Sequence, residues 1–212
     1  MKKLLIIFLL PMIFGCNENE PSSKYYYENG ELQAEGYYNE RGERHGLFKF
    51  YYENGQLKQE GNYKSEGDLS GKEDGLHRFY YDNGQSDAEV NYQDGEPHGL
   101  TRLYYQNGQL EQEGQFTDGK RNGWAKVYYE NGQLLQEANY TDGKESGLWK
   151  QYYPNGQLEM QYNLQDGKFY GISKVYYENS QLKYERNYKD GILILEKCWD
   201  ERGNVKECKT ID

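Results

Sequence analysis

The sequence has few of the residues from which most enzyme and metal sites are built. Among its 212 residues are three histidines, three cysteines and four prolines. The histidines, His45, His77 and His98, have no acid or nucleophile at a fixed offset from them, and two of them directly precede a glycine. We therefore interpret them as turn residues and expect no catalytic residue, metal site, cofactor or enzyme activity.

Long apolar runs are also scarce, and the main one lies at the start of the chain. It extends from Leu4 to Phe14, which is too short to cross a bilayer, since a spanning helix needs about 20 residues. Lys2 and Lys3 precede it and Gly15-Cys16 follows it, an order that resembles the signal peptide and lipobox of bacterial lipoproteins. An ordinary secretory signal and a cytosolic protein with an apolar start are the alternatives.

The lipoprotein interpretation divides the N-terminal region into two parts. Residues 1–15 are predicted to be a signal peptide, and Cys16 becomes the lipidated first residue of a polar tether at residues 16–24. The residue after the cysteine is Asn17 and not the aspartate that resembles an inner-membrane retention signal, which favours the outer membrane. The expected location is therefore the bacterial cell envelope, with a lipid anchor in the outer membrane or at the cell surface.

An excess of basic residues is missing as well. The chain has 25 Lys and Arg against 35 Asp and Glu, for a formal net charge of −10. Proteins that bind nucleic acid usually need a basic surface, so we expect no nucleic-acid partner. Anionic lipid headgroups would also repel the acidic body, which leaves membrane attachment to the lipid anchor.

Tyrosine and glycine, in contrast, are plentiful and recur in a fixed pattern. A string close to Tyr-Tyr-x-Asn-Gly-x-Leu begins seven times, at intervals of 24 residues in most cases. A period of this size is typical of a small supersecondary unit stacked on its neighbours. The copies begin at Tyr26, Tyr51, Tyr80, Tyr104, Tyr128, Tyr152 and Tyr176.

Each copy is predicted to be a β-hairpin. Asn-Gly between strand-like runs favours a two-residue type I′ turn, which would place Tyr129 opposite Leu134 and Lys126 opposite Glu137. The same rule brings unlike charges together in most copies, which supports the register, and only Lys150, opposite Gln161, departs from it. The predicted ion pairs are Lys24 with Glu35, Lys49 with Glu60, Arg78 with Glu89, Arg102 with Glu113, Lys126 with Glu137, and Lys174 with Glu185.

A second, looser turn joins one hairpin to the next. Asp-Gly recurs there, as in Asp118-Gly119, and an insertion around residues 64–71 lengthens the same turn in one unit. With two strands in each unit of about 24 residues, the sequence predicts an all-β fold, an elongated single-layer antiparallel β-meander. Residues 25–190 form the seven hairpin repeats and residues 191–212 form a C-terminal capping hairpin.

The capping region departs from the repeat. Ser180 replaces the turn glycine of the last copy, at a cost of about 1 to 2 kcal/mol if the left-handed conformation persists. Cys198 and Cys208 follow and are candidates for a disulfide bond. A turn centred on Arg202-Gly203 places them diagonally, beyond comfortable bridging distance, whereas a one-residue change of register brings them opposite each other. Both alternatives stay open.

Alternation along the strands separates an apolar surface from a charged one. The apolar surface is the predicted partner-binding face, because a single sheet has no second layer to cover it. Its predicted members are Tyr52, Tyr81, Tyr105, Tyr129, Tyr153, Tyr177, Leu57, Leu110, Leu134 and Leu158.

The unit Tyr-Tyr-Glu-Asn-Gly-Gln-Leu, Glu-Gly-Asn-Tyr and Asp-Gly-Lys-x-x-Gly-Leu-Trp resembles the bacterial variant of the MORN repeat over residues 25–190. Proteins of this variant are commonly described as antitoxins of toxin-antitoxin systems. The resemblance implies a protein that neutralises a toxin by binding it, and MORN repeats in general resemble membrane-proximal scaffolds.

Two hypotheses for function follow. The first is a lipid-anchored scaffold, antitoxin-like or immunity-like, that binds a protein partner through the tyrosine and leucine surface. The second is a glycan or cell-wall binding module, since the aromatic strings also resemble choline-binding repeats. Only Trp124, Trp149 and Trp199 are available for aromatic cages, which favours the first hypothesis.

Overall fold

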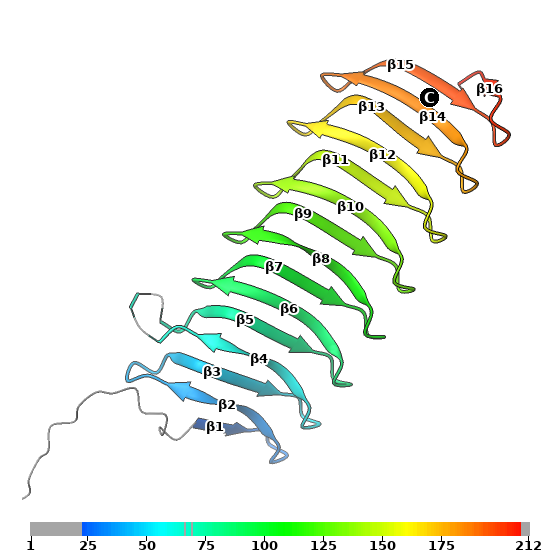
Figure 1. Ribbon diagram of the computed structural model, residues 1–212. Coiled ribbons are helices and arrows are strands. Elements are labelled where there is room, and N and C mark those ends of the chain that lie inside the picture. Colours follow the sequence, from blue (N-terminus) through cyan, green and yellow to red (C-terminus); the bar gives the residue numbers. More distant parts are fainter. Residues whose placement is uncertain (1–22, 66, 69, 209–212) are drawn as a thin grey trace, which may run out of the picture.

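The protein forms one long, open β-sheet, as a computed structural model shows for residues 23–65, 67–68 and 70–208 (Figure 1). Sixteen strands follow each other in chain order, and each pairs antiparallel with the next. The predicted single-layer meander is confirmed. The predicted signal peptide, Cys16 and most of the tether lie outside the described residues. Among those residues, no helix is long and apolar enough to cross a membrane.

Two strands belong to each repeat. The first strand leads into the Asn-Gly turn and the second leads away from it, so that β9 and β10, for example, form one hairpin. The strands are β1 Ser23–Tyr26, β2 Leu32–Tyr38, β3 Arg44–Tyr51, β4 Leu57–Tyr63, β5 Glu73–Tyr80, β6 Ser86–Gln93, β7 Glu96–Tyr104, β8 Leu110–Thr117, β9 Lys120–Tyr128, β10 Leu134–Thr141, β11 Lys144–Tyr152, β12 Leu158–Gln165, β13 Lys168–Tyr176, β14 Leu182–Lys189, β15 Ile192–Trp199 and β16 Val205–Lys206.

The Asn-Gly turn differs from the prediction. In β9–β10 the Gly132 amide donates to the Tyr129 carbonyl at 2.8 Å, and the Tyr129 amide donates to the Gln133 carbonyl at 2.8 Å. Gly132 has φ of 82°, whereas Asn131 is not among the residues with positive φ. This is a three-residue turn that ends in a left-handed glycine, so the predicted type I′ turn is wrong. The Asn131 side chain instead accepts a hydrogen bond from the Gln133 amide at 3.0 Å.

The type I′ geometry occurs at the other turn. Asp118 and Asp142 have φ of 48° and 50°, and the glycine after each is also left-handed, with φ of 75° and 79°. Thr117 pairs with Lys120 and Thr141 with Lys144, so each loop contains only these two residues. The tighter turn is therefore Asp-Gly and the looser turn is Asn-Gly, the reverse of the prediction. Aspartate tolerates positive φ, and both central positions require it.

The longer turn shifts the register beside it. Leu134 pairs with Tyr128, not with Tyr129 as predicted, and an irregularity between Leu134 and Gln136 restores the expected pairing of Gln136 with Val127. The extra turn residue and the bulge compensate for each other. The middle of every hairpin is therefore aligned as predicted, and Lys126 lies opposite Glu137.

The core is a narrow stripe along the middle of one face. Phe48 and His77 are fully buried, with 0% exposure. A side chain at Gly36 would meet the Phe48 ring at 2.4 Å, and one at Gly61 would meet the His77 ring at 2.2 Å. Each ring thus covers a glycine of the preceding hairpin, which compensates for the missing side chain in the strand. Further along the ribbon the same stripe contains Ala125, which is 4% exposed.

Candidate interaction surfaces

The sheet presents two faces with different chemistry. We call one the ion face; it contains the opposed Lys or Arg and Glu residues and the first tyrosine of each Tyr-Tyr pair, such as Lys126, Glu137 and Tyr128. The other is the core face, which contains the buried stripe of Ala125 and Ala138. The second tyrosine of each pair belongs to the core face because successive side chains alternate.

Charged residues on the ion face form a ladder that crosses the hairpin boundaries. Lys126 lies opposite Glu137 within its hairpin and opposite Glu113 of the preceding one. The sequence predicted the first kind of pair and missed the second. Predicted pairs with nitrogen–oxygen contacts are Lys24–Glu35 at 3.6 Å, Arg78–Glu89 at 3.7 Å, Arg102–Glu113 at 3.6 Å and Lys174–Glu185 at 3.6 Å. Contacts across hairpins include Arg78–Glu60 at 3.7 Å and Arg102–Glu89 at 3.6 Å.

The predicted exception is explained by the neighbouring hairpin. Lys150 lies opposite Gln161, as the sequence indicates. Its ammonium group turns to the preceding hairpin and donates to Glu137 at 2.7 Å. This hydrogen bond is the largest of the effects that lower the pKa of Glu137.

Tyrosine hydroxyl groups complete the ladder. Tyr128 donates to Glu113 at 2.8 Å, and Tyr152 donates to Glu137 at 2.8 Å. Burial, followed by the hydrogen bond to Glu113, raises the pKa of Tyr128 to about 12. Burial and the bond to Glu35 raise the pKa of Tyr51 to about 12 as well. These tyrosines join one hairpin to the next and keep the glutamates ordered.

The second tyrosines, six of the predicted partner-binding residues, form a row along the Asn-Gly side of the core face. Each donates its hydroxyl hydrogen to a backbone carbonyl of the following repeat, and each is half-buried. The row is therefore part of the contact between repeats. The bonds are Tyr52 to Tyr80 at 2.8 Å, Tyr81 to Tyr104 at 2.6 Å, Tyr105 to Tyr128 at 2.7 Å, Tyr129 to Tyr152 at 2.8 Å, Tyr153 to Tyr176 at 2.8 Å and Tyr177 to Trp199 at 2.9 Å.

The predicted leucines do not share a face with these tyrosines. Leu57, Leu110, Leu134 and Leu158 pair with Tyr51, Tyr104, Tyr128 and Tyr152, the first tyrosine of each pair. Directly opposed residues lie on the same side of a sheet, so the leucines lie on the ion face. The placement was wrong because the prediction assumed the shorter turn. Whether either row binds a partner stays a prediction.

An apolar row on the ion face was missed. Leu47, Leu148 and Ile172 each follow a glycine with positive φ and are 44%, 39% and 49% exposed. The signal was present in the Gly-Leu and Gly-Ile pairs that follow the Asp-Gly turn. Their periodicity identifies the row once the glycines are placed within strands, as Gly147 is in β11 and Gly171 in β13.

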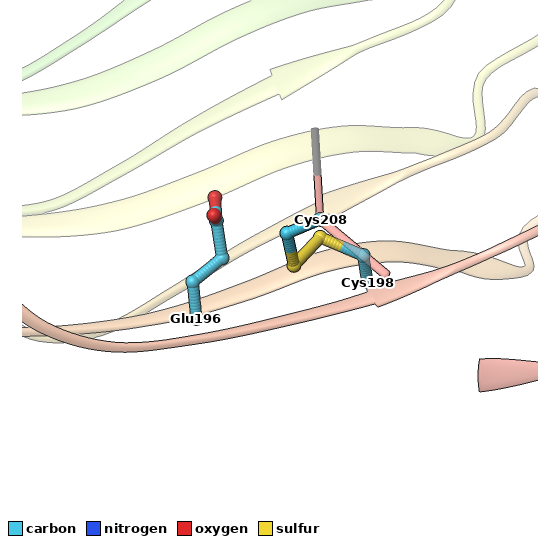
Figure 2. A group of neighbouring side chains, drawn as sticks. All are labelled: Glu196, Cys198 and Cys208. Carbon is cyan, nitrogen blue, oxygen red and sulfur yellow. A yellow bond between two sulfur atoms is a disulfide. The ribbon is translucent and has the colours of Figure 1, made fainter. Parts of the chain in front are cut away.

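The C-terminal end combines a disulfide bond with an exposed strand. Cys198 and Cys208 are bonded, with their Cα atoms 5.4 Å apart. Figure 2 shows the bond beside Glu196, whose carboxylate lies within 4.8 Å of the sulfur atoms. Both sulfurs are used in the bond, so this group offers no thiolate to a metal ion. Cys198 pairs with Lys206, as the predicted register requires.

The histidines take different positions. His77 is buried, and its Nε2 lies 2.8 Å from the Asn62 carbonyl oxygen. Burial is the main cause that lowers the pKa of His77. The Nδ1 atom of His98 lies 3.4 Å from Oδ1 of Asp118, and the ring of His45 packs against the ring of Tyr37. All three histidines lie within strands, His45 in β3, His77 in β5 and His98 in β7, so the interpretation as turn residues is wrong.

Comparison with known families agrees with the repeat boundaries. A family model described as MORN repeat variant matches residues 22–40, 44–65, 73–94, 97–118, 121–142, 145–166 and 169–190. Each match spans one hairpin of the sheet. No curated protein matches the chain.

Proposed function

Because the chain belongs to the MORN repeat variant family, we propose that it is a non-enzymatic, membrane-anchored repeat protein that binds a protein partner through its tyrosine row. The tyrosine row comprises Tyr52, Tyr81, Tyr105, Tyr129, Tyr153 and Tyr177. Stacked repeats commonly present an extended binding surface.

The observation that carries this proposal is the regular anchoring of the six tyrosines. Each hydroxyl is held by a carbonyl of the next repeat, for example Tyr129 by Tyr152 at 2.8 Å. The rings are therefore fixed before binding, and a partner that packs on them orders few additional rotamers. Tyrosine is also enriched at protein interfaces because it combines a large apolar ring with little conformational entropy.

The test compares two triple variants that remove tyrosines from the same three repeats. Replacement of Tyr105, Tyr129 and Tyr153 by threonine, which retains β-propensity, is expected to reduce partner capture from membrane extract by at least about tenfold. The matched control replaces Tyr104, Tyr128 and Tyr152, which lie on the ion face. A third variant with phenylalanine at the first three positions keeps the rings but removes the hydroxyl bonds that fix them, so its capture is expected to lie between that of the natural chain and that of the threonine variant.

The stability of each variant is measured by urea unfolding, so that loss of fold is separated from loss of binding. Equal loss of capture in both threonine variants, at equal stability, would show that the tyrosine row is not the binding surface.

The anchor and the kind of partner are further parts of the proposal. Lys2, Lys3, the apolar run and Gly15-Cys16 support lipidation of Cys16 at the cell envelope. A protein held there suits an immunity-like or antitoxin-like role against a toxin that reaches the membrane. Labelling with a radioactive fatty acid is expected in the natural chain and not in Cys16→Ser, and label in both would refute the anchor.

A second candidate, glycan binding, is favoured by one hollow near the first repeat. Its volume is about 360 Å³, and Tyr25, Tyr38, Phe50 and Arg44 are among its lining residues. Hollows of this size that combine aromatic rings with a few polar groups are typical of small-ligand sites. Binding of soluble cell-wall oligosaccharides that disappears in Phe50→Ala, while the tyrosine row is intact, would favour this function over the first.

A further inference from the structure

The outer edge of β15 is open along most of its length. Cys198 and Trp199 pair with β16, but among the described residues no strand pairs with the outer side of residues 192–197. Four successive apolar residues lie on this edge: Ile192 is 67% exposed, Leu193 44%, Ile194 57% and Leu195 50%. Exposed, apolar strand edges of this kind readily pair with another chain.

The ladder of opposed basic and acidic residues also ends at this edge. Lys126, a typical basic residue of a first strand, faces Glu113 on one side and Glu137 on the other. Lys197 occupies the same position in β15 and faces Glu185 on its inner side. Among the residues that the structure describes, Glu185 contacts Lys174 at 3.6 Å, and no strand places an acidic residue opposite Lys197 on its outer side. The outer position lacks its acidic partner.

The disulfide bond explains why the chain does not fill this position itself. Continuation of β16 beyond Lys206 would place Glu207 opposite Lys197 and Cys208 opposite Glu196. Cys208 would then be a diagonal neighbour of Cys198, at about 7 to 8 Å between Cα atoms. The bond holds these atoms at 5.4 Å, and the ladder ends at Lys206. Figure 2 shows Cys208 bonded to Cys198 beside Glu196.

A second copy of the chain does not supply the missing charge. The other end of the ribbon, β1, is also a first strand, and Lys24 occupies the position that Lys197 has in β15. A head-to-tail contact in the register of the ribbon would therefore oppose Lys24 and Lys197. Two β15 edges paired about a two-fold axis at Ile194 would place Glu196 opposite Ile192. Like charges and unmatched charges in opposed positions are unfavourable.

We propose that the free edge of β15 binds an extended segment of a different protein, which adds an antiparallel strand with an acidic residue opposite Lys197 and an apolar or aromatic residue opposite Ile194. Backbone hydrogen bonds would provide affinity and the alternating side chains would provide specificity, as in other cases of strand addition. This inference deepens the proposed protein binding but uses a surface separate from the tyrosine row.

The probe is a fluorescein-labelled peptide with the sequence of residues 89–94, Glu-Val-Asn-Tyr-Gln-Asp, taken from β6, where Glu89 faces Arg78 and Arg102. Its binding to the full chain is measured by fluorescence anisotropy, with an expected dissociation constant below about 1 mM. A second peptide carries lysine in place of the glutamate. The natural chain is expected to prefer the acidic peptide, and Lys197→Glu is expected to prefer the basic one.

Two matched substitutions locate the binding edge. Ile194→Lys, at the open edge, is expected to weaken binding of both the acidic and the basic peptide by at least about tenfold, because it removes an apolar contact and a lysine on a strand edge opposes pairing with another strand. Ile172→Lys changes an exposed residue of β13, which is paired on both sides, and is expected to change affinity by less than about twofold. The threonine variants of the tyrosine row should bind the peptide normally, so failure of that proposal is distinguishable from failure of this one.

Three results would overturn the inference. The first is no anisotropy change up to about 1 mM peptide. The second is unchanged peptide preference in Lys197→Glu, or equal loss in the two isoleucine variants. The third is concentration-dependent self-association of the full chain in sedimentation velocity that Ile194→Lys abolishes, which would identify a second copy as the occupant.

Discussion

Hairpin β3–β4 and strand β15 follow the same pairing pattern, yet they differ in how their side chains are covered. Phe48 of β3 is 0% exposed, since it lies over Gly36 and between the rings of Tyr38 and Tyr63. Ile194 of β15 is 57% exposed. A single-layer sheet has no opposing layer, so a side chain is buried only by neighbours on both sides along the ribbon. The middle of the core face is therefore covered by its own neighbours inside the array, whereas residues 192–197 of β15 have a neighbouring strand on one side only.

The largest test of this comparison uses two phenylalanines. Phe48→Ala is expected to lower the free energy of unfolding by about 3 to 5 kcal/mol, because it leaves a cavity over glycine. Phe169→Ala is expected to lower the free energy of unfolding by only about 1 kcal/mol. The ring centroid of Phe169 lies 5.0 Å from those of Tyr162 and Tyr188, but the side chain is 40% exposed. Urea unfolding of both variants checks this. Similar losses would show that the glycine-covering ring is not a special point of stability.

The disulfide bond is expected to have the next largest effect. Cys208→Ser removes a bond that closes a sequence separation of ten residues, and the expected loss is about 2 to 3 kcal/mol. Loss of stability should be confined to the C-terminal end, so hydrogen exchange should increase in β15 and β16 and not in β3. Increased exchange along the whole ribbon would mean that the cap stabilises the complete array.

Replacement of the turn residue Ser180 is expected to change stability less than loss of the disulfide bond, and to increase it rather than lower it. Its φ is 65°, whereas Gly156 has φ of 82° at the same position of the preceding hairpin. Ser180→Gly is expected to stabilise the protein by about 1 kcal/mol, and Gly156→Ser to destabilise it by a similar amount, because only glycine adopts this conformation without steric cost. Thermal unfolding of the pair checks the sign. A loss of stability in Ser180→Gly would contradict this explanation.

The smallest effect concerns the tyrosines of the ion face at high pH. The pKa of Tyr128 is raised from 10.0 to about 12 in the folded state. Its contribution to stability is therefore complete below about pH 10 and is lost as the pH rises towards 12. Tyr128→Phe should cost about 1 kcal/mol at neutral pH and should reduce the loss of stability at alkaline pH.

Tyr176→Phe is the matched control for that experiment. Gln161 takes the place that Glu113 has beside Tyr128, so among the described residues the Tyr176 hydroxyl group has no equivalent glutamate as a hydrogen-bond acceptor. Urea midpoints between pH 8 and 12 are compared for the two variants and the natural chain. Identical pH profiles would show that the carboxylate bonds do not contribute to alkaline unfolding.

Several features followed from the sequence because they depend on residues close together in the chain. The period of Tyr-Tyr and Asn-Gly predicted the hairpins, and the spacing of Lys126 and Glu137 predicted the register in the middle of each one. Two turn types were exchanged, because Asn-Gly and Asp-Gly both favour left-handed backbone. The strand pairing in the folded sheet shows that the Asp-Gly loop has two residues and the Asn-Gly loop has three.

Features that depend on neighbouring repeats were decided by the tertiary structure. Lys150 bonds to Glu137 of the preceding hairpin at 2.7 Å, and Tyr129 bonds to the Tyr152 carbonyl of the following one at 2.8 Å. Both partners are present in the sequence, but the local pattern does not predict which groups of neighbouring hairpins form hydrogen bonds with each other. The one-residue bulge at each Asn-Gly turn likewise moved the leucines to the ion face.

The sequence by itself thus determined that the chain is a row of antiparallel hairpins in one sheet, since strand period and turn chemistry are local properties. Only the stacking of the hairpins decided which side chains are buried, which ions are shared and which edge stays open. The reason is that in a one-layer sheet many of the covering and bonding partners belong to neighbouring hairpins, such as Gly36 beneath the Phe48 ring and the Tyr51 carbonyl that accepts from Tyr27 at 2.7 Å.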